Sequence, residues 1–284
     1  MPILQQELES RRGADAPAAA PAPKPAGPSF KLKPAFWRGL LSLLIAAVIW
    51  EAAARLFVNN PLFFAPLSAV LEKTGELWGS GELLKDMITS FQEFAIGFLV
   101  ASALGILVGM VMAGSETVRD FVDPWVSMLY STPTIALAPL LILWFGIGLT
   151  SHVAVVVLVV VFPVLINTFA GLANTDQHLI EVARSFGATP AQLFSKIRFP
   201  GALPFIVAGL RQGVARGLVG VVVAELFGAK AGLGFLILNS AQTFDTAGLF
   251  VGVLILAAAG VISVELVKLV ERRMAPWRFQ ETGE

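Results

Sequence analysis

The sequence contains no cysteine and few charged side chains. Its 284 residues include 2 His and 1 Tyr, and only 14% are Asp, Glu, Lys or Arg. The absence of cysteine excludes disulfide scaffolds, thiol catalysis, thiolate metal sites and palmitoyl anchors. Soluble domains carry about 25% charged residues, so this composition, with 56% hydrophobic residues, excludes most soluble folds. The formal net charge is zero, so no global basic field exists to attract nucleic acid.

Charged residues are missing from several long stretches. None occurs from Pro124 to Thr175, a run of 52 residues. One bilayer crossing needs about 20 apolar helical residues, so this run holds two crossings with a glycine-containing break near residues 146–152. The other uncharged runs predict four more crossings. We therefore expect six spans, at residues 38–58, 92–113, 126–147, 152–173, 203–225 and 246–269.

The sequence therefore predicts an all-α polytopic membrane protein with both termini in the cytoplasm. In that orientation fourteen of the twenty Lys and Arg residues lie inside, four lie outside and two lie in the fifth span, in keeping with the positive-inside rule. We expect a flexible Pro/Ala-rich cytoplasmic tail at 1–35, a transmembrane domain at 36–273 and a cytoplasmic C-terminal tail at 274–284. A short amphipathic helix is expected outside the membrane, around residues 67–78.

The one long cytoplasmic loop, at about 174–202, predicts two short amphipathic helices. Thr175 or Asp176 can cap the first helix, and Gly187 can take a positive φ just past its end. Four apolar residues fall at i, i+3, i+4 and i+7 and form one stripe. They are Leu179, Val182, Ala183 and Phe186. A helix pair this short cannot bury its stripes alone, so we expect it to dock on the bundle, on a partner protein, or on both.

The second loop helix is expected to start at Thr189 and Pro190, a cap followed by a first-turn proline. Its apolar stripe is Leu193, Phe194 and Ile197, and Pro200 is expected to end it. The two helices would then protrude as a rigid corner on the cytoplasmic side.

The spacing within this loop resembles the EAA loop of ABC-importer permeases. The family pattern is Glu-Ala-Ala, three residues, Gly, nine residues, Ile, one residue, Leu-Pro. This chain has Glu181-Val182-Ala183, Gly187, Ile197 and Phe199-Pro200 at those spacings, with Val182 and Phe199 as apolar departures. Residues 133–148, 167–168, 232–234 and 271–277 are similar to the nitrate, sulfonate and taurine branch of the family.

The resemblance implies a permease subunit of an ATP-driven importer in the bacterial inner membrane. The residues implied in coupling to the ATPase are Glu181, Ala183, Gly187, Ile197 and Pro200. The implied partners are two cytoplasmic ATPase subunits that hold ATP and Mg²⁺, a second permease copy, most simply an identical one, and a periplasmic or lipid-tethered binding protein. This chain is expected to bind no cofactor. In this branch the solute is expected to be an anion such as nitrate, a sulfonate, taurine or a related small organic molecule, and the sequence does not show which.

Charged residues near the fifth span are candidates for the translocation path. Arg216 and Arg211 could contact an anion, because a charge at membrane depth usually faces a cavity or a partner. Alternatively, Arg211 pairs or snorkels near the cytoplasmic surface. Glu225 could pair with a base, gate the outer mouth or be an interfacial carboxylate. Glu51 and Arg55, at i and i+4, are expected to form an ion pair.

Prolines and polar residues of the third and fourth spans are further path candidates. Pro133 and Pro139 could shape a pore wall or simply kink a helix. Asn167 and Thr168 could line a polar path or bond to another helix.

Two rival classes remain open on composition alone. A secondary transporter or channel would not need the EAA spacing. An intramembrane enzyme would need a catalytic or metal cluster, but the two histidines, His152 and His178, form none by spacing. The sequence also lacks a Walker-type phosphate loop, so we expect no ATP hydrolysis by this chain.

Overall fold

The computed structural model describes residues 34–58, 60 and 62–274, and no strand occurs among them. Among these described residues, those up to Ala46 and those from Ala47 to Met274 belong to two separate units. The helices are α2 (Pro34–Ala53) with a π-helical turn (Ala54–Val58), α3 (Leu67–Gly79), α4 (Glu82–Gly114), α5 (Glu116–Ser131), a 3₁₀ turn (Thr134–Leu137), α6 (Ala138–Phe145), α7 (Leu149–Ala173), α8 (Gln177–Ser185), α9 (Pro190–Leu193) with a π-helical turn (Phe194–Arg198), α10 (Phe199–Leu226), α11 (Leu233–Gln242) and α12 (Thr246–Met274). The expected tails at 1–35 and 274–284 lie almost entirely outside these residues.

Helices long and apolar enough to cross a membrane confirm five of the six expected spans. They are Trp37–Leu56, Glu82–Gly114, Leu149–Ala173, Pro190–Leu226 and Thr246–Arg273. Most extend beyond the boundaries expected from charge, because charged residues at a helix end can remain helical in the headgroup region.

The expected third span, at 126–147, is not one straight helix. α5 and the segment Thr134–Phe145 are bent by 88° at a short break. Thr132 there is extended, with φ −76° and ψ 140°, the conformation that a following proline imposes. Pro133 also has no N–H to continue the helix. The sequence suggested a kink here, and the structure shows a full break.

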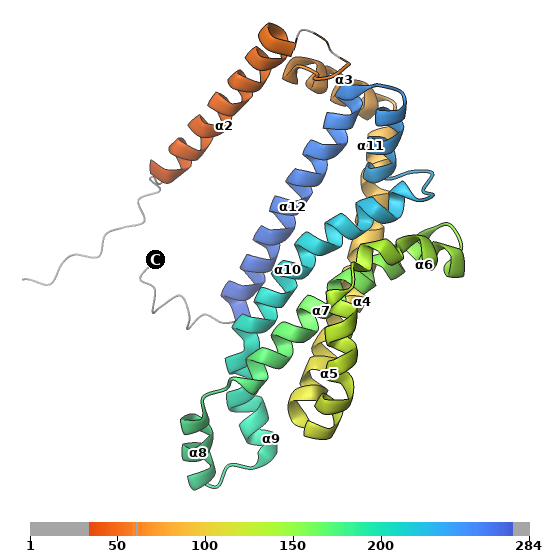
Figure 1. Cartoon of the computed structure of the whole chain (residues 1–284). Coiled ribbons are helices and arrows are strands. Elements are labelled where there is room, and N and C mark those ends of the chain that lie inside the picture. The colour runs from red at the N-terminus through yellow and green to blue at the C-terminus, as the bar shows by residue number, and fades with distance from the viewer. Residues whose placement is uncertain (1–33, 59, 61, 275–284) are drawn as a thin grey trace, which may run out of the picture. The chain divides into compact units, whose positions relative to one another are not determined.

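α7 lies between α4 and α10 in the bundle formed from Ala47 onward (Figure 1). Its side chains on both faces are buried, and Val156, Val160 and Val164 join Ala101 of α4 and Val221 of α10 in one apolar cluster. α7 reads as hydrophobic all round, which is typical of a helix with neighbours on several sides.

Glycines allow α4 to approach α7 closely. A β-carbon on Gly105 would lie 2.8 Å from the carbonyl oxygen of Val161, and one on Gly109 would lie 2.8 Å from that of Leu165. Lipid tails are as apolar as leucine, so close van der Waals contact replaces the hydrophobic effect as the force between membrane helices.

The bundle has two chemically different ends (Figure 1). α8 and α9 lie at one end, here called the α8 end, and α3 and α11 lie at the other, the α11 end. The expected amphipathic helix at 67–78 is confirmed as α3. The ammonium of Lys73 in α3 lies 3.1 Å from a carboxylate oxygen of Asp245, and this hydrogen bond raises the pKa of Lys73 above its ordinary value.

The expected ion pair between Glu51 and Arg55 is confirmed, with 2.6 Å between Oε1 and Nε. The Glu51 carboxylate also accepts hydrogen bonds from the backbone N–H and the hydroxyl of Ser68. The pair therefore ties the end of α2 to the start of α3, which lies 17 residues later.

Pro200 does not end the second loop helix, contrary to expectation. It lies in the first turn of α10, and the helix runs without interruption from Pro190 to Leu226. A π-helical turn at 194–198 directly precedes α10. Proline is tolerated where local hydrogen bonding is already irregular, so the hairpin at the α8 end joins the fifth span directly.

Candidate functional site

The α8–α9 hairpin (residues 177–193) is built by local capping. Asp176 caps α8 by accepting from the backbone N–H of His178 at 2.8 Å. Thr189 and Gln192 form a reciprocal capping box at the start of α9. The sequence left the first cap open between Thr175 and Asp176 and predicted the second at Thr189. The turn between the two helices is therefore fixed at each side.

Gly187 ends α8 in the left-handed conformation that the sequence predicts, with φ +78°. The N–H of Ala188 bonds to the carbonyl of Ala183, and that of Gly187 bonds to the carbonyl of Arg184. This is the Schellman arrangement, which satisfies helix-end carbonyls and favours glycine. A β-carbon on Gly187 would meet no atom of this chain within 4 Å, so the demand for glycine here comes from the backbone.

The apolar stripe of α8 faces away from the chain. The exposed fractions are 56% for Leu179, 55% for Val182 and 87% for Phe186, whereas Ile180 is buried. The rest of this chain therefore leaves most of the stripe uncovered. Glu181 is exposed as well, while Ala183, Ile197 and Pro200 are half-buried.

Arg211 of α10 pairs with Glu271 of α12. Its guanidinium lies 2.7 Å from Glu271 Oε2, and the Glu271 side chain is 6% exposed. Both residues lie toward the α8 end. Arg211 is therefore paired with a carboxylate, which is one of the alternatives that the sequence left open.

Arg216 lies one and a half turns further along α10 and is exposed. Its guanidinium donates to the hydroxyl of Tyr130 at 3.0 Å and lies 4.9 Å from the centre of that ring. The contact joins α10 to the end of α5. It leaves a cation on an uncovered face at membrane depth.

The polar pair in α7 bonds within its own helix. The side-chain amide of Asn167 donates to the carbonyl of Pro163, and the hydroxyl of Thr168 donates to that of Val164. Thr168 is buried beneath Gly109, and Asn167 is half-buried beside Gly209. The bond to another helix, one alternative from the sequence, is not formed. Pro133 lies at the break after α5, and Pro139 lies in the first turn of α6.

Glu225 is buried in a polar cluster at the α11 end. Only 1% of the residue is exposed, and its carboxylate accepts from the hydroxyl of Ser90 and the backbone N–H of Gly234. Of the alternatives that the sequence left open, this burial does not fit a plain interfacial carboxylate, and no basic side chain among the described residues forms a salt bridge with Glu225. Asp86 accepts similarly from the N–H of Gly232.

The turn before α11 requires glycine in order to receive these carboxylates. Gly232 has φ +126°, and a β-carbon on it would clash with the carboxylate of Glu225, well inside van der Waals contact. A β-carbon on Gly234 would lie 2.8 Å from Glu225 Oε2. The Gly-Leu-Gly sequence thus lets backbone N–H groups reach side chains of α4 and α10.

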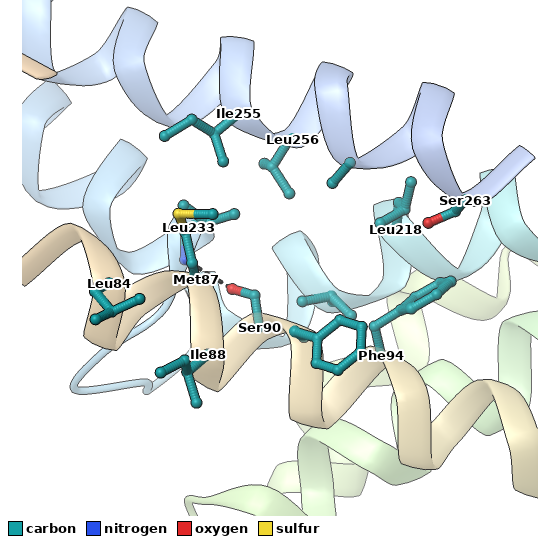
Figure 2. A pocket seen from close by; sticks show the side chains of 13 residues that line it. Leu84, Met87, Ile88, Ser90, Phe94, Leu218, Leu233, Ile255, Leu256 and Ser263 are labelled. Carbon is teal, nitrogen blue, oxygen red and sulfur yellow. Dashed lines mark hydrogen bonds between the residues drawn. The ribbon is translucent and has the colours of Figure 1, made fainter. Parts of the chain in front are cut away.

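An apolar pocket of about 290 Å³ lies beside this cluster, between α4, α10 and α12. Figure 2 shows Met87, Leu233 and Leu256 facing one another across it, with Ser90 at its edge bonded to the N–H of Leu233. Its lining is almost wholly hydrocarbon, so it offers nothing to a charged solute. Among the described residues, no group of three or more His, Asp or Glu is placed to hold a metal ion.

Comparisons with known proteins give the family. Residues 101–276 match the family model described as binding-protein-dependent transport system inner membrane component. The chain belongs to this family. It is 35% identical over 274 residues to the putative aliphatic sulfonates transport permease protein SsuC of Bacillus subtilis, covering 94% of this chain and 99% of that protein. It is 32% identical over 241 residues to the taurine transport system permease protein TauC of Escherichia coli, covering 83% and 88%.

Solved structures show the same fold. An amino acid ABC transporter crystallised with histidines has a TM-score of 0.59 at 17% identity, over 70% of this chain and 97% of that one. The inward-facing MetNI methionine ABC transporter has a TM-score of 0.55 at 19% identity, over 65% and 94%. The branch and the all-helical importer fold expected from the residues are therefore confirmed.

This permease is a multi-pass inner-membrane transport subunit, and ATP hydrolysis belongs to a separate subunit. Its family works with an ATPase and a solute-binding protein. The family therefore confirms the expected kinds of partner, an ATPase and a solute-binding protein.

Sequence reasoning missed one buried pair in the permease. Nδ1 of His152 lies 2.7 Å from Oε1 of Glu93, and both residues are at most 3% exposed. They are 59 residues apart and come from α7 and α4. One signal was available: Glu93 directly precedes an uncharged run, eleven residues inside a long apolar helix, where a carboxylate is costly without a partner.

Proposed function

We propose that this permease imports a small anionic solute and receives the ATPase on its α8–α9 hairpin. The observation that carries the proposal is the uncovered apolar stripe of α8 on a hairpin fixed by two caps and a Schellman turn. Exposed apolar side chains on a rigid protrusion favour burial in a partner's groove. The residues proposed at this contact are Glu181, Ala183, Gly187, Ile197 and Pro200.

The hairpin is suited to transmit movement because it has no flexible joint with the membrane. The second helix continues through 194–198 into α10, so a displacement at the hairpin reaches the fifth span as a rigid body. α10 in turn packs along α7, which gives the motion a path into the bundle.

We assign the α8 end to the cytoplasm, together with both termini and the two tails. The partition of Lys and Arg supports this orientation. The α11 end, with α3, then faces the outside and the solute-binding protein.

For the translocation path we favour Arg216 over Arg211. Arg216 is exposed at membrane depth, and its contact with Tyr130 leaves donors available to an anion. Arg211 is engaged by Glu271. Glu225, Asn167, Thr168, Pro133 and Pro139 then shape the path's walls, the first through its cluster and the last two through the break at α5 and α6. The names of two relatives, an aliphatic sulfonates permease and a taurine permease, support a solute that carries a sulfonate or a similar anionic group.

We further propose two identical permease copies per transporter, each on one ATPase subunit that holds ATP and Mg²⁺. Large apolar residues along α2, α4 and α12 are exposed in the single chain, and Arg216 would face the space between two copies. A secondary transporter or channel is the alternative, and it would assemble without an ATPase.

The test is Gly187→Val in vesicles that contain the permease, the ATPase and the binding protein with its solute. A residue other than glycine at φ +78° costs about 1 kcal/mol or more, and the displaced α8 no longer fits the ATPase groove. We expect loss of uptake and of solute-stimulated ATP hydrolysis, with the permease still in the membrane. Glu181→Ala should weaken both less, since an exposed charge contributes little.

Two control variants make the test specific. Gly187→Asn accepts a positive φ more readily and should retain much of the activity, whereas Gly201→Ala, at a helical site with nothing within 4 Å, should be silent. Parental uptake by Gly187→Val with the ATPase still bound would remove the hairpin from the coupling. Failure of an ATPase to co-purify with the parent would favour the secondary transporter.

A further inference from the structure

A second pocket, of about 460 Å³, opens at the α11 end where α4, α7 and the turn after α10 meet. Gln92 and Glu93 of α4, His152 of α7 and Lys230 of the turn are among the residues that line it. It contains none of the residues proposed above for coupling or for the path. Unlike the apolar pocket of Figure 2, it is lined by ionisable and amide side chains.

Two buried atoms of this lining have no hydrogen-bond partner among the described residues. They are Oε2 of Glu93 and Nε2 of His152, and the two residues are 3% and 2% exposed. The other carboxylate oxygen and the other ring nitrogen lie 2.7 Å apart and bond to each other. A buried polar atom without a partner costs free energy, so this bonded pair has two positions at which a ligand would be stabilised.

Both unpartnered atoms are hydrogen-bond acceptors. A carboxylate oxygen only accepts, so Nδ1 of His152 carries the hydrogen of the bond to Glu93. In a neutral imidazole with its hydrogen on Nδ1, Nε2 keeps a lone pair and accepts as well. The free oxygen of Glu93 is an acceptor whatever the state of the ring. The pair therefore favours a ligand that donates hydrogen bonds.

The side chains around the pair do not supply these donors. Lys230, the only lysine or arginine in the lining, is exposed, and no salt bridge to it occurs in the part of the chain that the structure describes. Glu225 lies close enough to act electrostatically on Glu93, but its oxygens already accept from Ser90 and Gly234. A carboxylate has no hydrogen to give.

The acceptors also indicate the charge of the donor. A carboxylate forms its strongest hydrogen bonds with a positively charged group, and a cation there would offset the buried charge of Glu93. No group of three His, Asp or Glu among the described residues could hold a metal ion instead. A primary ammonium group has three N–H donors on one atom, as in lysine. Lys230 is exposed to water, which weakens its repulsion of such a group.

We propose that this pocket binds a primary ammonium group, which donates to Oε2 of Glu93 and to Nε2 of His152. A free amine and the amino group of an imported solute share this chemistry. Only the position of the pocket at the outer entrance rests on the proposed function, because the binding depends on the Glu93–His152 pair.

The probe is methylammonium chloride, titrated into permease labelled with ¹⁵N-histidine and reconstituted with unlabelled ATPase in lipid nanodiscs. The chain has two histidines, so His178 at the α8 end serves as an internal reference. We expect the Nε2 signal of His152 to shift saturably while it remains that of a nitrogen without a bonded hydrogen, and the signals of His178 to stay in place. Tetramethylammonium chloride has the same charge but no N–H, and it should give no saturable shift.

Glu93→Gln is expected to weaken methylammonium binding at least about tenfold, the effect of one hydrogen bond to a charged group. Glutamine can still accept from His152, but its amide nitrogen replaces the free acceptor. Glu82→Gln is the matched control: it removes an exposed carboxylate of the same helix that does not line the pocket, and it should leave the affinity unchanged. Ligand-observed NMR measures the affinity of each variant, and thermal unfolding shows that each is folded.

His152→Asn separates the two acceptors. The asparagine amide can donate to Glu93 as Nδ1 does, but it has no second ring nitrogen, so binding should weaken less than in Glu93→Gln. Taurine and ethanesulfonate distinguish the sources of the ammonium group, since only taurine has an amino group. Displacement of methylammonium by taurine alone would assign the pocket to a solute, whereas displacement by neither would assign it to a free amine.

Several results would overturn the site. The absence of a saturable response to methylammonium would mean that buried water satisfies the two acceptors, and an equal response to tetramethylammonium would show that no N–H is recognised. A hydrogen on Nε2 before the amine is added would remove the second acceptor. An infrared band of a protonated carboxyl group that disappears in Glu225→Gln would show that Glu225 supplies the hydrogen to Glu93.

This test is independent of the coupling test. A saturable His152 response together with parental uptake by Gly187→Val would remove the coupling proposal and leave the ammonium site standing. Loss of uptake in Gly187→Val without a His152 response would do the reverse.

Discussion

At the residue scale, charged side chains inside the bundle differ in how they are neutralised. Glu225 is held by a hydroxyl and a backbone N–H, Glu93 by His152, and Arg211 by Glu271. Each contact lowers the cost of placing a charge in a low-dielectric interior. Arg216 is different, because a tyrosine hydroxyl and ring leave its charge uncompensated.

Arg216→Gln is therefore expected to reduce solute uptake about tenfold, since a hydrogen bond to a charged group contributes about 1.5–3 kcal/mol, while ATPase binding is retained. Tyr130→Phe keeps the ring beside the guanidinium and should have a smaller effect. The measurement is uptake in the reconstituted system, alongside the thermal unfolding of each variant. Arg211→Gln should lower stability more than uptake, because it breaks the contact between α10 and α12. Equal uptake by the parent and Arg216→Gln would remove this arginine from the path.

At the element scale, helix contacts depend on small residues and on breaks. α4 approaches α7 so closely at Gly105 and Gly109 that a β-carbon on either glycine would lie 2.8 Å from a carbonyl oxygen of α7. The bend after α5 follows from Pro133 and its extended neighbour Thr132. Both features come from what a residue lacks: a side chain in one case and a backbone N–H in the other.

Gly105→Leu is expected to destabilise the permease by about 1–3 kcal/mol, the usual cost of overpacking. Its side chain would collide with Val161 and Val164, and α4 would have to move away from α7. The matched control is Gly114→Leu, on the same helix but with nothing within 4 Å. Thermal unfolding in detergent measures both, and equal midpoints for the two variants would contradict the packing described here.

At the scale of the whole molecule, the two ends differ in chemistry. The α8 end presents an apolar hairpin, and the α11 end presents a buried acidic cluster with a polar pocket. In the proposed orientation, the α8 end would meet the ATPase and the α11 end would meet the binding protein. The orientation is the part of the proposal that the basic residues support and that a direct measurement can decide.

Single cysteines can decide the orientation, because the native chain has none. Ser185→Cys in α8 should react with a membrane-impermeant maleimide only from the cytoplasmic side, and Ser80→Cys only from outside. Both positions are exposed, and Ser80 avoids the strained φ of +79° at its neighbour Gly81. Labelling of both cysteines from one side would refute the assigned topology.

The sequence by itself determined the features that depend on local chemistry. Uncharged runs located the membrane helices, and the caps at Asp176 and Thr189 and the positive φ of Gly187 were all readable in order along the chain. The Glu51–Arg55 pair was readable too, because its partners are one helical turn apart. The spacing from Glu181 to Pro200 indicated the family, because the motif lies within one continuous segment of the chain.

Only the tertiary structure decided how distant residues meet. Glu93 finds His152 across 59 residues, Arg211 finds Glu271 across 60, and Glu225 finds Ser90 across 135. Each helix offers several faces to its neighbours, and hydropathy does not specify which faces pair. The break at Pro133 and the continuous helix through Pro200 show the same limit: a proline's effect depends on whether surrounding packing supplies the hydrogen bonds and contacts it removes.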